Sequence, residues 1–303
     1  MSIVDEGLHD AVKAYEAPKT PTLDFSTSTG VVSLDSALGG KLPSGAVEIY
    51  GPPSAGKTSL LYEIIGTAQR SGMVAALCPT EYLDIPYMRV FDIDLNSLSL
   101  ITGNYGEDVL DGACRFIEMH QDIPCLLAID SATSLRPEED EFGQWNLMID
   151  TFLEVALPVL GRGSCIVMTN QVRTRRSIKP ERFFVDGDID STARKIIDRF
   201  STRLEVSRID VTDSSFTMQV NIVANAYSRP ATIIGLPFSK GSGVDTMRDL
   251  VRVARTAGVI EQSGSWYSFD DVSLGQGEGP ATAILEVNPE LAKRVLDQLM
   301  EEA

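Results

Sequence analysis

One eight-residue segment constrains the fold of this chain more than any other feature. Residues 51–58 read Gly-Pro-Pro-Ser-Ala-Gly-Lys-Thr, which is a complete G-x-x-x-x-G-K-T phosphate-binding loop. The apolar run at 46–50 before the loop is typical of a β-strand, and residues 59–65 after it are typical of a helix. Because the motif works only between a strand and a helix, the segment predicts a nucleotide site at the edge of an α/β sheet.

Physical chemistry gives each part of this loop a role. Glycines permit backbone turns in which successive N–H groups point at phosphate oxygens, and the positive end of the following helix adds to the attraction. We expect Lys57 to reach the β- and γ-phosphates and the Thr58 hydroxyl to bind Mg²⁺, so ATP and Mg²⁺ are the expected cofactors. The alternative is a glycine turn with a chance lysine. The residues expected to contact the nucleotide here are Gly51, Pro52, Pro53, Ser54, Ala55, Gly56, Lys57, Thr58 and Ser59.

Composition argues against several other classes of protein. No apolar run among the 303 residues approaches the ~20 needed to span a bilayer, and the N-terminus lacks a signal-peptide pattern. The four cysteines show no C-x-x-C spacing, and the two histidines are too few for a histidine-based metal site. We therefore expect reduced core thiols in a cytoplasmic protein without membrane association. The net charge of −17, taken alone, argues against DNA binding.

From Ser28 to about Pro237, short apolar strands alternate with amphipathic helices. Such alternation predicts an α/β fold with a mostly parallel sheet covered on both faces and with ligands at the carboxyl ends of its strands. The expected strands are 46–50, 73–78, 98–102, 125–130, 164–169, 201–206 and 216–223, and the expected helices lie near 58–70, 106–120 and 146–160.

The chain is expected to have three parts. Residues 1–27 form an N-terminal segment whose short amphipathic helix packs on its own body or docks on a neighbouring subunit. Residues 28–240 form the core with the phosphate loop. A glycine-rich hinge at 241–243 then begins a small domain, 241–303, with a helix, a short strand at 266–269 and a last helix from about Pro289.

Polar side chains follow three of the expected strands. Asp130 ends the apolar run 125–129, and in phosphate-loop proteins an aspartate there orients Mg²⁺. Glu81 follows the strand at 73–78, where a carboxylate would polarise an attacking water; a surface glutamate in a loop is the alternative. The amide of Gln171 would lie beside the γ-phosphate, or else belong to a simple turn.

One segment is basic, in contrast to the net negative charge of the chain. Between 173 and 182 there are five basic residues and one acid, and two phenylalanines follow at once. Basic residues beside aromatics suit a groove that tracks a nucleic-acid backbone and contacts its bases. A solvated basic loop is the alternative. The residues that would bind DNA are Arg173, Arg175, Arg176, Lys179, Arg182, Phe183 and Phe184.

Several segments together resemble the bacterial RecA-type recombinase family, from about Ser28 to the C-terminus. The resemblance implies a RecA-like phosphate-loop ATPase core with a mostly parallel sheet between helices, a short N-terminal helix and a small α+β C-terminal domain. The segments that carry it, beyond the phosphate loop, are 27–30, 33–39, 42–45, 47–51, 125–131, 170–173, 264–268 and 275–277.

The resemblance also implies roles for individual residues. Glu81 matches the catalytic glutamate, and Gln171 matches the glutamine that couples the γ-phosphate to the DNA loop; with Lys57 they form the expected catalytic set. Asp84 and Tyr87 match the segment that holds adenine. Asp130, a second Mg²⁺ residue beside Thr58, and Ser131 match the acidic strand end.

The same resemblance implies how the protein would meet DNA and its own copies. Residues 135–147 match the first DNA loop, and the second begins at Arg173. The N-terminal segment would dock on the next protomer, which makes a helical filament on single-stranded DNA. The implied function is an ATP-dependent recombinase with DNA-dependent ATPase activity that pairs this strand with homologous duplex DNA.

Three departures from the family pattern matter. Two lysines that reach ATP in the neighbouring protomer correspond here to Ala224 and Ala226, and Arg229 is the nearby candidate for a replacement. The second DNA loop lacks paired glycines. The lead before Thr27 is short and no long acidic tail follows Ala303, which suits a compact, divergent member such as a phage would encode.

The missing lysines motivate an alternative function. The chain would then be a non-catalytic or regulatory paralogue that binds nucleotide and DNA without efficient strand exchange. A hexameric helicase or clock-type ATPase on the same core is a third class, and the C-terminal segments argue against it.

Overall fold

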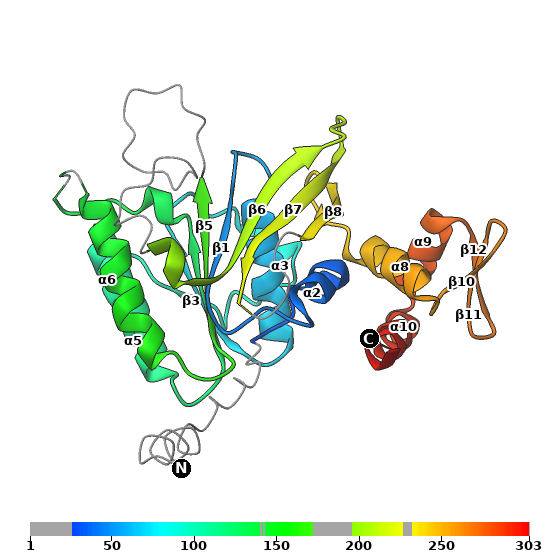
Figure 1. Ribbon diagram of the computed structural model, residues 1–303, viewed down its shortest axis with the longest axis horizontal. Coiled ribbons are helices and arrows are strands. Elements are labelled where there is room, and N and C mark those ends of the chain that lie inside the picture. Colours follow the sequence, from blue (N-terminus) through cyan, green and yellow to red (C-terminus); the bar gives the residue numbers. More distant parts are fainter. Residues whose placement is uncertain (1–25, 140, 142, 172–195, 227–231, 303) are drawn as a thin grey trace, which may run out of the picture.

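The computed structural model describes residues 26–139, 141, 143–171, 196–226 and 232–302. Within these residues, nine strands form one sheet in the order β3-β2-β4-β5-β1-β6-β7-β8-β9 (Figure 1). The first six strands in this order run parallel, and β7, β8 and β9 are antiparallel to their neighbours. The strands are β1 (Gly45–Gly51), β2 (Val74–Pro79), β3 (Ser99–Leu100), β4 (Cys125–Asp130), β5 (Cys165–Gln171), β6 (Phe200–Ile209), β7 (Ser215–Asn225), β8 (Thr232–Ser239) and β9 (Gly243–Val244).

Helices cover both faces of the parallel part of the sheet, with α3 on one side and α5 and α6 on the other (Figure 1). The strands alternate accordingly. In β4, Leu126 and Ala128 pack with α3, whereas Leu127 and Ile129 pack with α5 and α6. Burial on both faces explains why these strands read as unbroken apolar runs. The helices are α2 (Val32–Leu38), α3 (Lys57–Arg70), α4 (Ile85–Arg89), α5 (Gly106–Met119), the 3₁₀ turn η1 (Ala132–Ser134) and α6 (Gln144–Val159).

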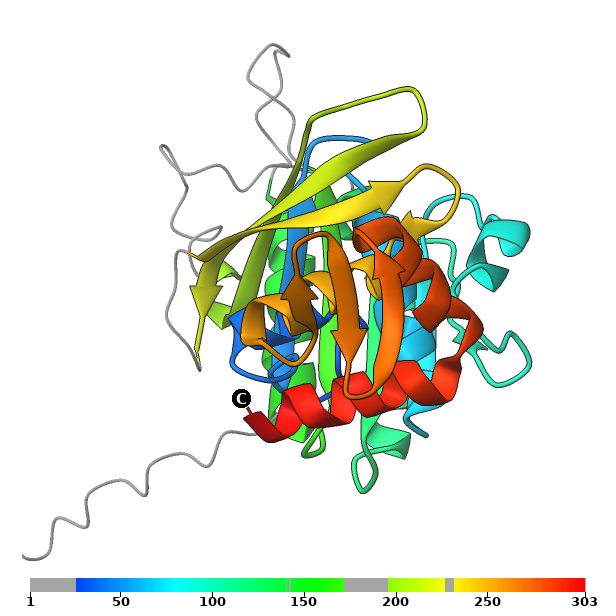
Figure 2. The ribbon, with the colours of Figure 1, turned by 90° about the vertical axis from the view of Figure 1, so that its right-hand side faces the viewer.

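The C-terminal part builds a separate small core. A three-stranded antiparallel sheet of β10 (Glu261–Ser263), β11 (Trp266–Phe269) and β12 (Val272–Gln276) lies beside three helices (Figure 2). Phe269 is 1% exposed and is among the largest fully buried side chains of the described residues. The helices are α8 (Thr246–Ala257), α9 (Glu278–Val287) and α10 (Pro289–Glu302).

The predicted fold class is confirmed, with additions that the sequence pattern did not single out. β8 was not expected because Gly235 and Pro237 interrupt its apolar residues. Proline is tolerated there because β9 pairs with β8 only from Phe238 onward, so the position of Pro237 is an edge. The boundaries at 27 and 240 stay predictions, and the expected N-terminal helix lies outside the described residues.

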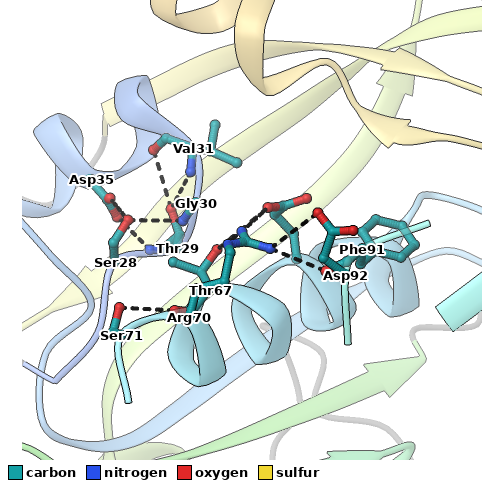
Figure 3. A network of polar contacts seen from close by, with 11 residues as sticks. Ser28, Thr29, Gly30, Val31, Asp35, Thr67, Arg70, Ser71, Phe91 and Asp92 are labelled. Atoms are coloured by element: carbon teal, nitrogen blue, oxygen red, sulfur yellow. Dashed lines mark hydrogen bonds and ion pairs between the residues drawn. The ribbon is translucent and has the colours of Figure 1, made fainter. Parts of the chain in front are cut away.

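A polar network fixes the turn before α2, which packs closely against α3 (Figure 3). The Asp35 carboxylate accepts hydrogen bonds from the Thr29 amide at 2.8 Å and from the Ser28 hydroxyl. Burial outweighs these bonds and raises the pKa of Asp35 to about 6. Gly30, with a φ of 82°, lies so close to α3 that an added Cβ would stand 2.5 Å from the Thr67 hydroxyl. This turn therefore requires glycine.

A hydrogen bond between α2 and α8 joins the core to the C-terminal part. The amide of Ser33, in the first turn of α2, donates to the Asp249 carboxylate of α8 at 2.8 Å. Asp249 is 2% exposed, and its burial raises the pKa of the carboxyl group. The carboxylate occupies the positive end of α2, where a negative charge is stabilised.

Candidate nucleotide-binding site

The phosphate loop follows β1 and leads into α3, as the sequence predicts. Two of its glycines are required by close packing. A Cβ on Gly51 would stand 2.1 Å from the backbone oxygen of Val206, and one on Gly56 would stand 2.3 Å from the Met218 side chain. Gly56 also has a φ of 92° where it caps α3. The loop is thus held between the central strand and the β6–β7 hairpin.

Lys57 begins α3 and folds back over the loop. Its ammonium donates to the backbone oxygens of Gly51 and Pro52, at 3.1 and 2.9 Å. Burial lowers the pKa of Lys57, and the nearby carboxylates Asp130 and Glu81 oppose that shift. The ammonium therefore lies at the loop, where it can exchange these carbonyl oxygens for phosphate oxygens.

Asp130 stands at the end of β4, opposite the loop. The Thr169 hydroxyl donates a hydrogen bond to its carboxylate, and both this hydroxyl and that of Thr58 lower the pKa of Asp130. Burial nevertheless raises its pKa, with a further increase from the nearby Glu81 charge. A carboxylate and a threonine hydroxyl side by side fit Mg²⁺, which takes few protein oxygens and completes its shell with water and phosphate. Among the described residues, no three His, Cys, Asp or Glu side chains cluster as in a dedicated metal site.

Glu81 is the centre of a second polar cluster, which joins three of the predicted site residues. Its Oε1 accepts from the Ser131 hydroxyl, the Ser134 hydroxyl and the Gln171 amide, each at 3.1 Å. Thr80 fixes Ser131 from the other side, since its hydroxyl accepts from the Ser131 amide at 2.7 Å and donates to the Ser131 oxygen at 2.8 Å. The peptide bond before Ser131 is cis.

The segment predicted to hold adenine is arranged by two hydrogen bonds. Asp84 caps α4 by accepting from the Tyr87 amide at 3.0 Å. The Tyr87 hydroxyl meets the Ser59 hydroxyl of α3 at 2.6 Å, which joins this segment to the phosphate-loop helix. The Tyr87 ring packs edge-on against Phe91, with centroids 5.1 Å apart.

These groups line one cavity of about 510 Å³. The sequence pattern does not indicate six of the lining residues, which are Thr169 of β5, Arg208 of β6, Phe216 of β7, Phe238 of β8, and Lys240 and Gly241 in the turn after β8. No local sequence pattern marks these residues, because they approach the phosphate loop only through pairing between strands that are far apart in the chain. Of the predicted nucleotide residues, four do not line the cavity: Gly51, Pro52, Ala55 and Asp84. The lining residues are Pro53, Ser54, Gly56, Lys57, Thr58, Ser59, Glu81, Tyr87, Asp130, Ser131, Thr169, Gln171, Arg208, Phe216, Phe238, Lys240 and Gly241.

The basic segment from Arg173 to Phe184 begins two residues after Gln171 and lies outside the described residues. Of the segment 135–147, the last four residues already belong to α6. Ala224 pairs with Arg203 of β6, and the Ala226 amide donates to Ser201.

Within the described chain, no helix is both long and apolar enough to cross a membrane. A model of the RecA N-terminal domain matches residues 18–244, and a model of the RecA C-terminal domain matches residues 248–303. Protein RecA of Cereibacter sphaeroides is 30% identical over 298 residues, which cover 92% of this chain and 85% of that protein. Protein RecA of Wigglesworthia glossinidia brevipalpis is 30% identical with 92% and 88% coverage, and that of Parvibaculum lavamentivorans is 31% identical with 89% and 77% coverage.

Proposed function

The chain belongs to the RecA family, and on that premise we propose that it is an ATP-dependent recombinase. It would assemble into a helical filament on single-stranded DNA and pair that strand with homologous duplex DNA. The predicted resemblance to a divergent bacterial RecA-type protein is confirmed by the two matched domains and by the relatives at about 30% identity.

The contact between Gln171 and Glu81 is the observation that supports this proposal most. A glutamate beside a nucleotide cavity is positioned to polarise an attacking water. Here its carboxylate is held by the amide of the last residue of β5, 3.1 Å away. The chain continues directly from Gln171 into the basic segment, so DNA bound there would act on Glu81 through a single side chain.

The remaining groups would have separate roles in phosphoryl transfer. The backbone N–H groups of the loop and the Lys57 ammonium would bind the phosphates. Mg²⁺, held through Thr58 and Asp130, would neutralise charge that develops on the phosphate oxygens. Tyr87, fixed to Ser59, would border the base. Stabilisation of developing charge by such pre-positioned groups is usually the largest single contribution to the rate enhancement of an enzyme.

ATP hydrolysis with and without single-stranded DNA tests the enzymatic part of the proposal. We expect the wild type to be stimulated by DNA, and Lys57→Ala to lose activity. Glu81→Gln should keep nucleotide binding and lose at least ~100-fold in turnover, the scale of a general-base contribution. Glu290→Gln, an exposed glutamate of α10, is the matched control and should behave as the wild type. A Lys57→Ala variant with normal hydrolysis would contradict the proposal.

A second function is favoured by Ala224 and Ala226. The resemblance implies that cations at these positions reach the nucleotide of the next protomer, and alanine supplies none. The chain would then be a regulatory paralogue that binds nucleotide and DNA without efficient strand exchange. Preserved ATP binding together with hydrolysis that is indifferent to DNA would favour this reading over the first.

A further inference from the structure

The candidate nucleotide cavity has a second wall, opposite the carboxylates. It is formed by Arg208 of β6, Phe216 of β7, Phe238 of β8, and Lys240 and Gly241 in the turn after β8. Arg208 and Lys240 are both exposed, and both bring positive charge to this wall. The contacts of each side chain decide which of the two cations is available to bind a ligand.

The strand register fixes the direction of Arg208. Arg208 pairs with Met218 of β7, and side chains of directly paired residues lie on the same face of a sheet. Met218 faces the phosphate loop, because its Cε lies 2.3 Å from where a Cβ of Gly56 would be. Arg208 therefore extends from the face that meets the loop.

Aromatic stacking supports the guanidinium in this direction. Its carbon lies 5.9 Å from the centre of the Phe216 ring, which in turn stacks on Phe238 at 4.3 Å and 21°. Both rings are buried, at 6% exposure, and Phe238 also approaches Gly56. The side chains of Arg208, Phe216 and Phe238 thus form a row. Phe238 lies at the end next to the phosphate loop, and the Arg208 guanidinium lies at the other end.

Lys240 already has partners. Its ammonium donates to the backbone oxygens of Thr212 and Asp213, at 2.9 and 3.0 Å, and so ties the turn after β8 to the tip of the β6–β7 hairpin. Arg208, by contrast, has no carboxylate within ion-pair distance among the described residues. Within the part of the chain that the structure describes, Arg208 is therefore the cation of this wall that can meet a ligand.

We propose that Arg208 is a phosphate-binding residue that contacts the triphosphate of the nucleotide held by its own subunit. The inference rests on the proposed function, since it takes the cavity to be the ATP site. Arginine suits this task because its planar donors match phosphate oxygens in pairs. In the family pattern, two lysines bring positive charge to the nucleotide of the neighbouring protomer, and Ala224 and Ala226 stand at their positions here. Arg208 would instead bring positive charge to the nucleotide of its own subunit.

Binding of a fluorescent ATP analogue at low protein concentration, without DNA, tests the proposal. Hydrogen bonds between charged groups are stronger than those between neutral groups, so Arg208→Met should weaken ATP binding by roughly tenfold or more. Arg208→Lys, which keeps the charge, should bind more tightly than Arg208→Met. Arg115→Met, an exposed arginine of α5 outside this cavity, should bind as the wild type.

The outcomes separate this inference from the function on which it rests. If the wild type binds ATP, Lys57→Ala does not, and Arg208→Met binds within twofold of the wild type, only the inference fails. If the wild type does not bind ATP, or Lys57→Ala binds equally well, the proposed function fails and the inference with it. Affinity for single-stranded DNA is measured in parallel. A loss there with unchanged ATP binding would assign Arg208 to a DNA surface and overturn the proposal.

Discussion

A buried ion pair beneath the candidate site allows one prediction with a defined magnitude. The Arg203 guanidinium of β6 donates to the Glu48 carboxylate of β1 at 2.7 Å, and these side chains are 6% and 1% exposed. The second Glu48 oxygen accepts from the Asn170 amide at 2.6 Å. The pair thus connects the strand before the phosphate loop to the residue before Gln171.

Removing one member of the pair should destabilise the folded state, because the other charged side chain stays buried without an opposite charge. We expect Glu48→Leu and Arg203→Met each to lower the free energy of unfolding by about 3–5 kcal/mol. In a chain of this size, that corresponds to a fall in melting temperature on the order of 10 °C. The double variant leaves no unpaired charge, so it should be more stable than the less stable single variant.

Urea unfolding followed by circular dichroism measures these differences. The matched control is Asp270→Asn, which alters an ion pair with Arg294 whose side chains are 48% and 56% exposed. Exposed pairs contribute about 0–1 kcal/mol, so this variant should change little. The reasoning is refuted if either buried single variant also falls within 1 kcal/mol of the wild type, or if the double variant loses the sum of both single effects.

Three further predictions concern other parts of the fold. Since burial raises the pKa of Asp35 from 3.8 to about 6, the folded state holds this proton more tightly. Its stabilisation, about 3 kcal/mol, is present below pH 4 and lost as pH rises through 6, and urea unfolding across this range should show the fall in the wild type but not in Asp35→Asn. Gly51→Ala should cost at least ~1–3 kcal/mol more than Gly72→Ala in the same assay, because only Gly51 faces a backbone oxygen at 2.1 Å, while a Cβ on Gly72 would meet nothing within 4 Å; equal costs would contradict this. Asp249→Ala should speed hydrogen exchange at the Ser33 amide and lower stability by about 0.5–2 kcal/mol, and unchanged protection of that amide would show that the bond to α8 contributes nothing.

The parts of the site that sequence could predict are those that lie at strand ends within short motifs. Lys57 and Thr58 follow one strand directly, and Asp130 ends another. In a parallel sheet all such ends meet at one edge, so their gathering follows from the alternation of strands and helices alone. Sequence alone allows two interpretations each of Glu81 and Gln171, because it does not reveal that their side chains meet.

Sequence patterns do not indicate the second wall of the cavity. Arg208 and Phe238 approach the phosphate loop only because β6 and the antiparallel strands β7, β8 and β9 extend the sheet past β1. Register between residues so far apart in the chain is set by long-range packing, which no local pattern encodes. The ion pair of Glu48 and Arg203 was equally hidden, since each charge reads as an isolated exception within an apolar strand.

Recombinase activity is measured by mixing the protein with a labelled single strand, a homologous duplex and ATP, and quantifying joint DNA molecules. We expect joint molecules to form with the wild type, to require ATP, and to be absent with a heterologous duplex or with Lys57→Ala. DNA-stimulated ATP hydrolysis without any joint molecules would show that the chain is not a recombinase and would favour the regulatory paralogue.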